Sequence, residues 1–464
     1  MSKILIKNSL LIATMNDDRK EISGGYILIE NDKIVSIGND IPNIEADKVI
    51  DASNMVILPG FVNTHHHFYQ TLTRNIPKMQ NAELFTWLTD YYEVWRELTE
   101  EGVEVSTKTA IAELMLSGTT TTSDHLYLFP QKTSAQLIDV EIEAAKEMGI
   151  RFYPTRGSMS LSNSNGGLPP DDVVQTEVEI QADTERLIAK YHDESIGSML
   201  RIALAPCSPF SVTPELMKQT AEYAEANNLL IHTHLAETLD EEQFCLDKYG
   251  KRPVEYVKSL GWINHNAWFA HAVHLNDNEI KLMGKIGCGV SHCPSSNMRL
   301  GSGIARIKTM MKAGINVSLA VDGSASNDSS NILSELRNAL LLSRMRGKSN
   351  WLSARDVLWL ATRGGAAVLD RKDIGQIAEG KQADLAMFSV ENLEYAGGMS
   401  DPLAALIFTQ RMSPVDYLIV NGEVKIRNGK LDFDEKKHIK EHNRIAQEML
   451  ENAINNSEIN FLRE

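Results

Sequence analysis

The chain has 464 residues, which is more than one compact core of ordinary size but suits one large barrel with a small additional domain. Apolar residues make up 43% of the sequence and charged residues 23%, as in soluble globular proteins. The net charge of −16 argues against nucleic acid and against an anionic membrane as partners, because both attract basic surfaces.

The cysteines form no Cys-x-x-Cys pair and lack the density of a secreted disulfide scaffold; they are Cys207, Cys245, Cys288 and Cys293. The first residues lack the long apolar core of a signal peptide. No apolar run reaches the length of a membrane-spanning helix. These features predict a reduced, cytoplasmic setting without membrane association.

The N-terminal residues 1–58 read as short strands and turns, without a catalytic pattern. Strand-forming residues cluster at 4–13, in a hairpin with an Asn-Asp turn at 24–38, and at 49–51. We expect these strands to form one part of a small β-sandwich, because they are too few to fold alone.

The C-terminal residues 370–464 have the same character and are expected to complete that sandwich. They predict a strand over residues 383–388 and a hairpin on an Asn-Gly turn over residues 416–427. A charged amphipathic helix follows from residue 436 to about 453 and is expected to pack on the outside.

The middle of the chain, residues 59–369, alternates strand-like runs with helical patterns. The eight runs are residues 60–65, 119–124, 151–155, 201–205, 229–234, 267–271, 287–291 and 316–321. Eight such βα units predict an α/β fold of the (β/α)8, TIM-like barrel type. A doubly wound open sheet is the alternative, but no Gly-rich phosphate turn follows the first run.

Polar residues collect at the ends of these runs, where a barrel places its catalytic groups. Scattered core histidines would not fall so regularly at strand ends, so the pattern predicts a site there. The residues concerned are His65, His67, Asp124, His125, His232, His234, Glu237, His271, His274, His292 and Asp322.

A metal site is the chemistry that these residues suit best. His65 and His67 lie two apart and therefore point to one side of a strand, whereas His66 is expected to face out of the barrel mouth. With His234 and Asp322 they supply the three or four ligands of a zinc-like catalytic site. A histidine cluster without a ligand is the alternative reading of the His-His-His stretch alone.

Two further residues are placed to work on a water molecule at such a metal. Glu237 follows His234 by three residues, and its carboxylate suits a proton shuttle. His271 is placed to bond the same water, held by Asp322. The alternative role for Glu237 is to cap the next helix. The fourth run, residues 201–205, contains no lysine of the kind that bridges two metals when carboxylated, which favours one metal.

Five motifs, in this order, resemble the deaminase and chlorohydrolase branch of the amidohydrolase superfamily. They are residues 59–67 (PGFVNTHHH), 232–237 (HTHLAE), 270–275 (AHAVHL), 291–297 (SHCPSSN) and 321–327 (VDGSASN). The similarity covers essentially the whole chain and includes residues 375–377 (GQI) and 380–385 (GKQADL).

This resemblance implies one divalent metal, usually zinc and in some members iron. It implies His65, His67, His234 and Asp322 as metal ligands, and Glu237 and His271, with Asp322, as the catalytic groups. It also implies a small heterocyclic substrate, water as co-substrate, and a homo-oligomer.

Within this branch, the motifs are most similar to members that deaminate 8-oxoguanine to urate and ammonia. Isoxanthopterin or other pterin deaminases and hydroxy-s-triazine aminohydrolases are similar too. The Arg-Phe pair that guanine deaminases carry on the fourth strand is replaced by Ala205-Pro206-Cys207, which weakens plain guanine as the substrate. A non-catalytic barrel scaffold is an alternative of a different class, and it is disfavoured because no ligand is missing.

Several residues are candidates for contacts with the substrate. Gln70 matches a substrate-binding glutamine of guanine deaminases, and an amide suits a ring edge that mixes N–H and C=O. Trp87 and Tyr127 are candidates for stacking, with simple packing as the alternative. Arg156 is a candidate for contact with a carbonyl, with a surface salt bridge as the alternative, and His292 is often near the substrate in relatives.

Overall fold

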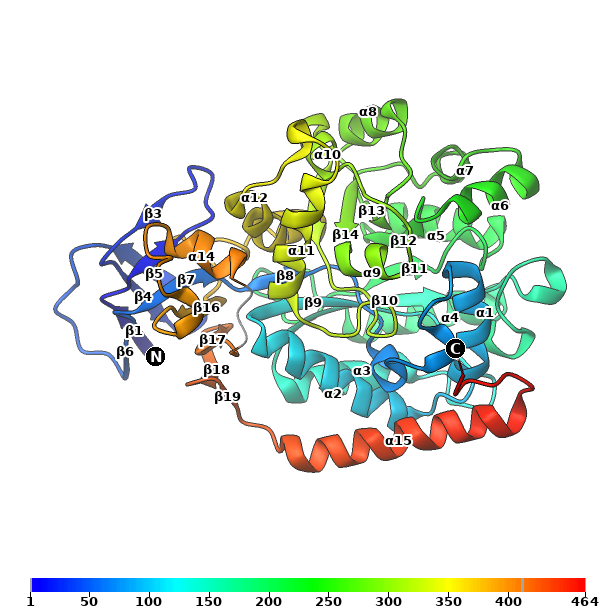
Figure 1. The fold of residues 1–464 in the computed structure, drawn as a ribbon, viewed down its shortest axis with the longest axis horizontal. Coiled ribbons are helices and arrows are strands. Elements are labelled where there is room, and N and C mark those ends of the chain that lie inside the picture. The colour runs from blue at the N-terminus through cyan, green and yellow to red at the C-terminus, as the bar shows by residue number, and fades with distance from the viewer. Residues whose placement is uncertain (1, 410–412, 464) are drawn as a thin grey trace.

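Eight parallel strands form the central sheet of the computed structural model, which describes residues 2–409 and 413–463 (Figure 1). Residues 1, 410–412 and 464, which belong to the expected terminal ranges, lie outside the described residues. In order, the strands are β8 (Phe61–Asn63), β9 (Thr119–Leu126), β10 (Arg151–Ser158), β11 (Ala203–Pro206), β12 (Ile231–Leu235), β13 (Ala267–His271), β14 (Gly289–His292) and β15 (Asn316–Leu319). All eight predicted strands are present, so the barrel prediction is confirmed.

The barrel closes between its first and last strands. The backbone N–H of Asp322 donates to the carbonyl of His65 at 3.2 Å, and that of Val321 donates to the Asn63 side chain at 3.0 Å. These bonds join the segment after β15 to β8 and the residues that follow it. They bring residues from the two ends of the barrel sequence to one place.

Helices cover the outside of the barrel and bury their apolar faces against the strands. Several begin at a side-chain cap, as at Thr99, Thr213 and Thr238. They are α1 (Leu84–Trp95), α2 (Glu100–Leu116), α3 (Leu137–Met148), α4 (Glu177–Tyr191), α5 (Pro214–Ala226), α6 (Leu239–Tyr249), α7 (Pro253–Ser259), α8 (Asp277–Ile286), α9 (Pro294–Arg299), α10 (Ile307–Ala313), α11 (Ile332–Arg344), α12 (Ala354–Trp359) and α13 (Gly365–Val368).

Strands from both ends of the chain form two further sheets, as expected for the sandwich. One has the order β5 (Lys33–Gly38), β4 (Tyr26–Glu30), β1 (Lys3–Lys7) and β6 (Lys48–Asp51). The other has the order β19 (Lys430–Leu431), β18 (Glu423–Arg427), β17 (Tyr417–Val420), β16 (Leu385–Ser389), β7 (Met55–Pro59), β2 (Leu11–Ala13) and β3 (Glu21–Ile22). An isoleucine-rich core drawn from both sheets lies between them.

The two predicted hairpins are present, and their turns touch. Asn31 lies in the left-handed region at the β4–β5 turn, and Asn421 and Gly422 both do so at the β17–β18 turn. A Cβ on Gly422 would lie 1.8 Å from the Asn31 carbonyl oxygen, so this close approach requires glycine.

The C-terminal helix α15 (Glu435–Asn456) runs back along the outside of the barrel (Figure 1). It contacts α1, α2 and the short 3-10 helix η1 (Phe68–Thr73), and the short α14 (Pro402–Phe408) precedes it in sequence. The His442 Nε2 lies 3.2 Å from the Thr71 hydroxyl, so α15 supports the segment that directly follows β8. Among the described residues, no helix has both the length and the apolar character to cross a membrane.

Candidate active site

Three histidines and one aspartate converge at the carboxyl ends of the barrel strands. His65 and His67 follow β8, His234 is the penultimate residue of β12, and Asp322 follows β15. The His67 and His234 Nε2 atoms are 3.2 Å apart, and the Asp322 Oδ1 lies 3.3 Å from the Nε2 atoms of both His65 and His67. All four side chains are buried.

The Nδ1 atom of each of these histidines already has a partner. That of His67 donates to the His125 carbonyl at 2.8 Å, and that of His234 donates to the Cys207 carbonyl at 2.7 Å. The His65 Nδ1 lies 2.8 Å from the Nε2 of His232. The rings are therefore oriented so that the Nε2 atoms of His65 and His67 face Asp322 and the Nε2 of His234 faces that of His67.

This arrangement fits a divalent cation. Burial lowers the pKa of His65, His67 and His234 below the ordinary value, so the three rings are neutral at physiological pH. With the proton on Nδ1, three Nε2 lone pairs and one carboxylate oxygen face one another without a hydrogen between them. A metal ion bound by all four relieves that repulsion, and imidazole with carboxylate is a ligand set that zinc prefers.

Glu237 and His271 lie beside this cluster. The His271 Nε2 is 3.5 Å from the Glu237 Oε2 and 3.8 Å from the Asp322 Oδ2, while its Nδ1 bonds the Asn297 Oδ1 at 2.9 Å. Burial raises the pKa of Glu237 above its ordinary value. Burial opposes protonation of His271, but the carboxylates of Glu237 and Asp322 raise its pKa overall.

The alternative role of Glu237 as a helix cap is wrong. The cap of α6 is Thr238, whose hydroxyl accepts from the Glu241 N–H. The Glu237 Oε1 instead accepts from the Ser302 hydroxyl at 3.4 Å. The Glu241 carboxylate accepts from the backbone N–H groups of Ala236 and Glu237, both at 2.8 Å, and so fixes the turn that presents the Glu237 side chain.

The backbone bends sharply where these groups leave the strands. Ala236, His271 and Asp322 have φ values of 52°, 70° and 67°, in the left-handed region that non-glycine residues seldom occupy. Such conformations persist only where the surroundings enforce them, and they cluster at functional sites. Here they turn side chains from three strands toward one centre.

A cavity adjoins the cluster. His67, His234, Glu237, His271 and Asp322 form its polar floor, and Leu84, Leu88, Phe210 and Leu300 form part of its apolar wall. Of the predicted substrate contacts, the structure brings Gln70, Trp87 and Tyr127 to this cavity. The Gln70 Oε1 and the Trp87 Nε1 are buried and have no hydrogen-bond partner in the described chain.

Arg156 and His292 are not among the residues that line the cavity. Arg156 is buried behind the sheet, where its Nε lies 2.6 Å from the Asp183 carboxylate and its guanidinium covers the Phe129 ring. The alternative role of Arg156 was a salt bridge on the surface; the salt bridge is present, but it is buried. His292 ends β14 in the core, and burial lowers its pKa to about 3.

The expectation that His66 faces out of the barrel mouth is wrong. Its side chain is fully buried on the side of β8 away from the cluster, and its Nε2 lies 2.8 Å from the Ser330 hydroxyl. The loop after β15 folds over this position, which the strand pattern alone does not reveal. His66 therefore joins two loops of the barrel face.

Several supporting residues were not assigned a role from the sequence. His125 lies within the histidine cluster, close enough for its ligand atom to lie within 4.8 Å of those of His65, His67 and His234. His232 and Asn297 orient His65 and His271, and Glu241 orients Glu237. His232 and Asn297 belong to the quoted motifs, which was a signal, but their partners His65 and His271 come from other strands.

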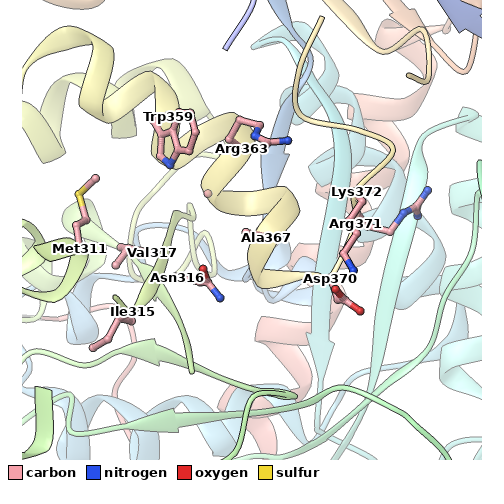
Figure 2. Close-up of a pocket in the computed structure, with 11 residues that line it drawn as sticks. Met311, Ile315, Asn316, Val317, Trp359, Arg363, Ala367, Asp370, Arg371 and Lys372 are labelled. Carbon is pink, nitrogen blue, oxygen red and sulfur yellow. The ribbon is translucent and has the colours of Figure 1, made fainter. Parts of the chain in front are cut away.

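A second cavity lies at the opposite end of the barrel, beside the start of β15 (Figure 2). Asn316, Trp359 and Arg363 line it, with Arg371 and Lys372 at its edge. None of the candidate catalytic residues reaches it. Catalytic groups of such barrels come from the carboxyl ends of the strands, so we place the active site at the first cavity.

The chain is similar to known deaminases along most of its length. The chain is 48% identical over 93% of its length to an 8-oxoguanine deaminase from Pseudomonas aeruginosa, 95% of which is covered. It is 32% identical over 97% of its length to an isoxanthopterin deaminase from an unknown prokaryote, 98% of which is covered.

Among solved structures, the atrazine chlorohydrolase from Arthrobacter aurescens complexed with zinc superposes with a TM-score of 0.91. It is 33% identical, and the match covers 96% of this chain and all of that one. The sequence model of the amidohydrolase family matches residues 56–425. The chain therefore belongs to the amidohydrolase family.

Proposed function

We propose that this enzyme is a metal-dependent hydrolytic deaminase of an amino-substituted oxo-heterocycle, and that its substrate is 8-oxoguanine. The observation that carries the proposal is the convergence of His65, His67, His234 and Asp322 beside the Glu237–His271 pair at one cavity. The similarity to the Pseudomonas 8-oxoguanine deaminase supports the choice of substrate.

The metal would be held by His65, His67, His234 and Asp322. When bound, a divalent metal supplies Lewis acidity that lowers the pKa of a water molecule toward neutrality. Zinc is the proposed ion, because three neutral imidazoles and one carboxylate form one of its preferred ligand sets, and iron is the second candidate.

The proton transfers fall to the neighbouring side chains. His271 and Asp322 accept the proton of the attacking water, and the side-chain oxygen of Asn297 holds the His271 ring with Nε2 toward the reaction centre. Glu237 delivers a proton to the ring nitrogen beside the amino-bearing carbon. Its raised pKa suits a carboxyl that must carry a proton near neutral pH.

The hydroxyl derived from water then bonds to the amino-bearing carbon. Glu237, now a carboxylate, moves the proton of this hydroxyl to the amino nitrogen, and the C–N bond breaks as the new carbonyl forms. One water is consumed and one ammonia is released, so the 2-amino group of 8-oxoguanine becomes the third carbonyl of urate. Both proposed proton acceptors, His271 and Asp322, line the cavity.

The cavity wall supports a flat, polar ring. Gln70 offers an unpaired amide oxygen to a ring N–H, and Trp87 and Tyr127 supply aromatic surface. Cys207 lines the fourth-strand side, where a small side chain leaves room that an arginine would fill. The alternative pterin and triazine substrates would use the same proton transfers and would differ only in the contacts that their rings make with the residues lining the cavity.

An ammonia-release screen tests the substrate. The panel is 8-oxoguanine, guanine, isocytosine, isoxanthopterin and hydroxy-s-triazines, and we expect the highest kcat/KM for 8-oxoguanine. A higher value for a pterin or triazine would replace the proposed substrate without changing the reaction class. No release from any of them, together with the absence of bound zinc or iron, would favour a binding scaffold instead.

The Glu237→Gln variant tests the proton shuttle. We expect it to retain the metal but to lose turnover, because an amide cannot deliver a proton to the ring. The matched control is Glu222→Gln, which changes an exposed carboxylate of α5 that takes no part in the site. Near-wild-type turnover in Glu237→Gln would contradict the assignment.

A further inference from the structure

A chain of hydrogen bonds runs from the metal-binding cluster into the barrel core through His232. This residue lies on β12, two positions before His234, and is completely buried. Its Nε2 lies 2.8 Å from the His65 Nδ1, and its Nδ1 lies 3.0 Å from the carbonyl oxygen of Trp268 on β13. The ring stacks on the Trp268 indole with 4.4 Å between the ring centres.

Only one placement of the protons satisfies this chain when both rings are neutral. A carbonyl oxygen can only accept, so the His232 Nδ1 carries a hydrogen and its Nε2 carries a lone pair. The His65 Nδ1 must then donate to that lone pair. The remaining lone pair of His65 is on Nε2, which faces the Asp322 carboxylate at 3.3 Å.

We propose that His232 is a positioning residue that fixes the tautomer and orientation of His65 for metal binding. It rests on the proposed metal site but not on the identity of the substrate. Groups that bond the second nitrogen of a metal-binding histidine orient the ring and raise its basicity. In this enzyme that group is itself an imidazole, anchored by a main-chain carbonyl.

The other two histidine ligands show why His232 is a distinctive position. His67 and His234 donate directly to the carbonyls of His125 and Cys207, which no side-chain substitution removes. His65 alone among the three depends on a side chain. A single substitution can therefore release the His65 ring while leaving the four proposed metal ligands in the sequence.

Three variants separate the hydrogen bond from the volume of the side chain. His232→Phe keeps a ring on Trp268 but removes the acceptor. His232→Gln and His232→Met have similar length, and only the glutamine offers an oxygen that can accept from the His65 Nδ1–H. The measurements are the zinc affinity of the metal-free protein, from competition with a chromophoric chelator, and the melting temperature of the metal-free protein.

We expect zinc affinity to fall about 10- to 100-fold in His232→Phe and His232→Met, the range found when such supporting groups are removed. His232→Gln should recover most of that loss. The metal-free His232→Gln and His232→Met variants should melt at similar temperatures, so that the difference in zinc affinity reports on the hydrogen bond rather than on stability. Should His232→Phe fail to fold, the comparison of Gln with Met decides.

The proposal is overturned if the acceptor-free variants bind zinc within about threefold of the wild type, or if Gln binds no better than Met. Failure of the wild-type protein itself to bind zinc is a different result, because it would remove the proposed metal site rather than the role of His232. The two failures are therefore distinguishable.

Discussion

The substitution Gly323→Ala tests whether the Gln70 amide binds the substrate, because the added methyl group displaces the Gln70 side chain without removing a polar group. Gly323 follows Asp322, and a Cβ built on it would lie 1.9 Å from the Gln70 Oε1 and 2.3 Å from the Gln70 Cδ. Real Cβ atoms essentially never come closer than 3.0 Å to another heavy atom. The amide must therefore retreat by more than about 1 Å, and its side chain is flexible enough to do so.

The size of the effect follows from this displacement. A hydrogen bond of about 2.9 Å that lengthens by 1 Å is lost, which costs about 0.5–1.5 kcal/mol for a neutral pair. Misplacing the ring by a similar distance can cost up to about 100-fold in rate. We expect kcat/KM for the oxo-heterocycle to fall about 10- to 100-fold, or roughly 1.4–2.7 kcal/mol.

The assay is a double-mutant cycle of Gly323→Ala with Gln70→Ala, read as kcat/KM by ammonia release. With the amide already gone, the added methyl meets nothing of Gln70, so Gly323→Ala should change kcat/KM less than about threefold in that background. Metal content should stay unchanged in all four proteins. An equal loss in both backgrounds would refute the reasoning, because the methyl would then act through Asp322 or the backbone.

Three further outcomes are expected. Removal of metal by a chelator should abolish turnover and lower the melting temperature, and zinc should restore both; unaltered melting would contradict a bound ion. Burial raises the pKa of Glu335 to about 8 from an ordinary 4.5, so the folded protein holds a proton that the unfolded chain releases, and stability should fall as pH rises between these values. In urea unfolding at pH 5 to 8, Glu335→Gln should remove this pH dependence of the free energy of unfolding, which is up to about 1.4 kcal/mol per pH unit. If the variant and the wild type showed parallel pH profiles, the raised pKa of Glu335 would be contradicted. Arg151→Met removes the ion-pair partner of the buried Asp384 carboxylate, which keeps only its bond from the Asn421 N–H among the described contacts, and should destabilise by about 3–5 kcal/mol. A second change, Asp384→Leu, should recover much of that loss.

The barrel and its polar centre were predictable because both depend on local patterns. Alternation along a strand puts His65 and His67 on one side, and strand ends meet at one face of a barrel whatever the loops do. The fourth strand begins at Ala203 rather than at residue 201, and before it only an isolated bridge joins Leu200 to Phe152 of β10. Such shifts at strand ends do not disturb the site.

The rest depends on contacts between distant segments. Arg156 stands at a strand end like the other polar residues, yet it points behind the sheet to Asp183, because neighbouring residues of a strand face opposite sides. His66 is covered by a loop more than 250 residues away in sequence. The partners of His65 and His271 are likewise set by packing between strands and loops, so no spacing in the sequence identifies them.

The sheet that joins the two ends of the chain has a consequence for protein synthesis. β7 pairs with β16 along five residues, and β16 leaves the ribosome only after the entire barrel has been made. At about 5–20 residues per second, the edge of β7 stays open for tens of seconds, and open edges invite pairing with other chains. The bond from His442 of α15 to Thr71 forms later still. The last-made segments are therefore needed both to pair with β7, directly before the barrel, and to support the segment that carries Gln70.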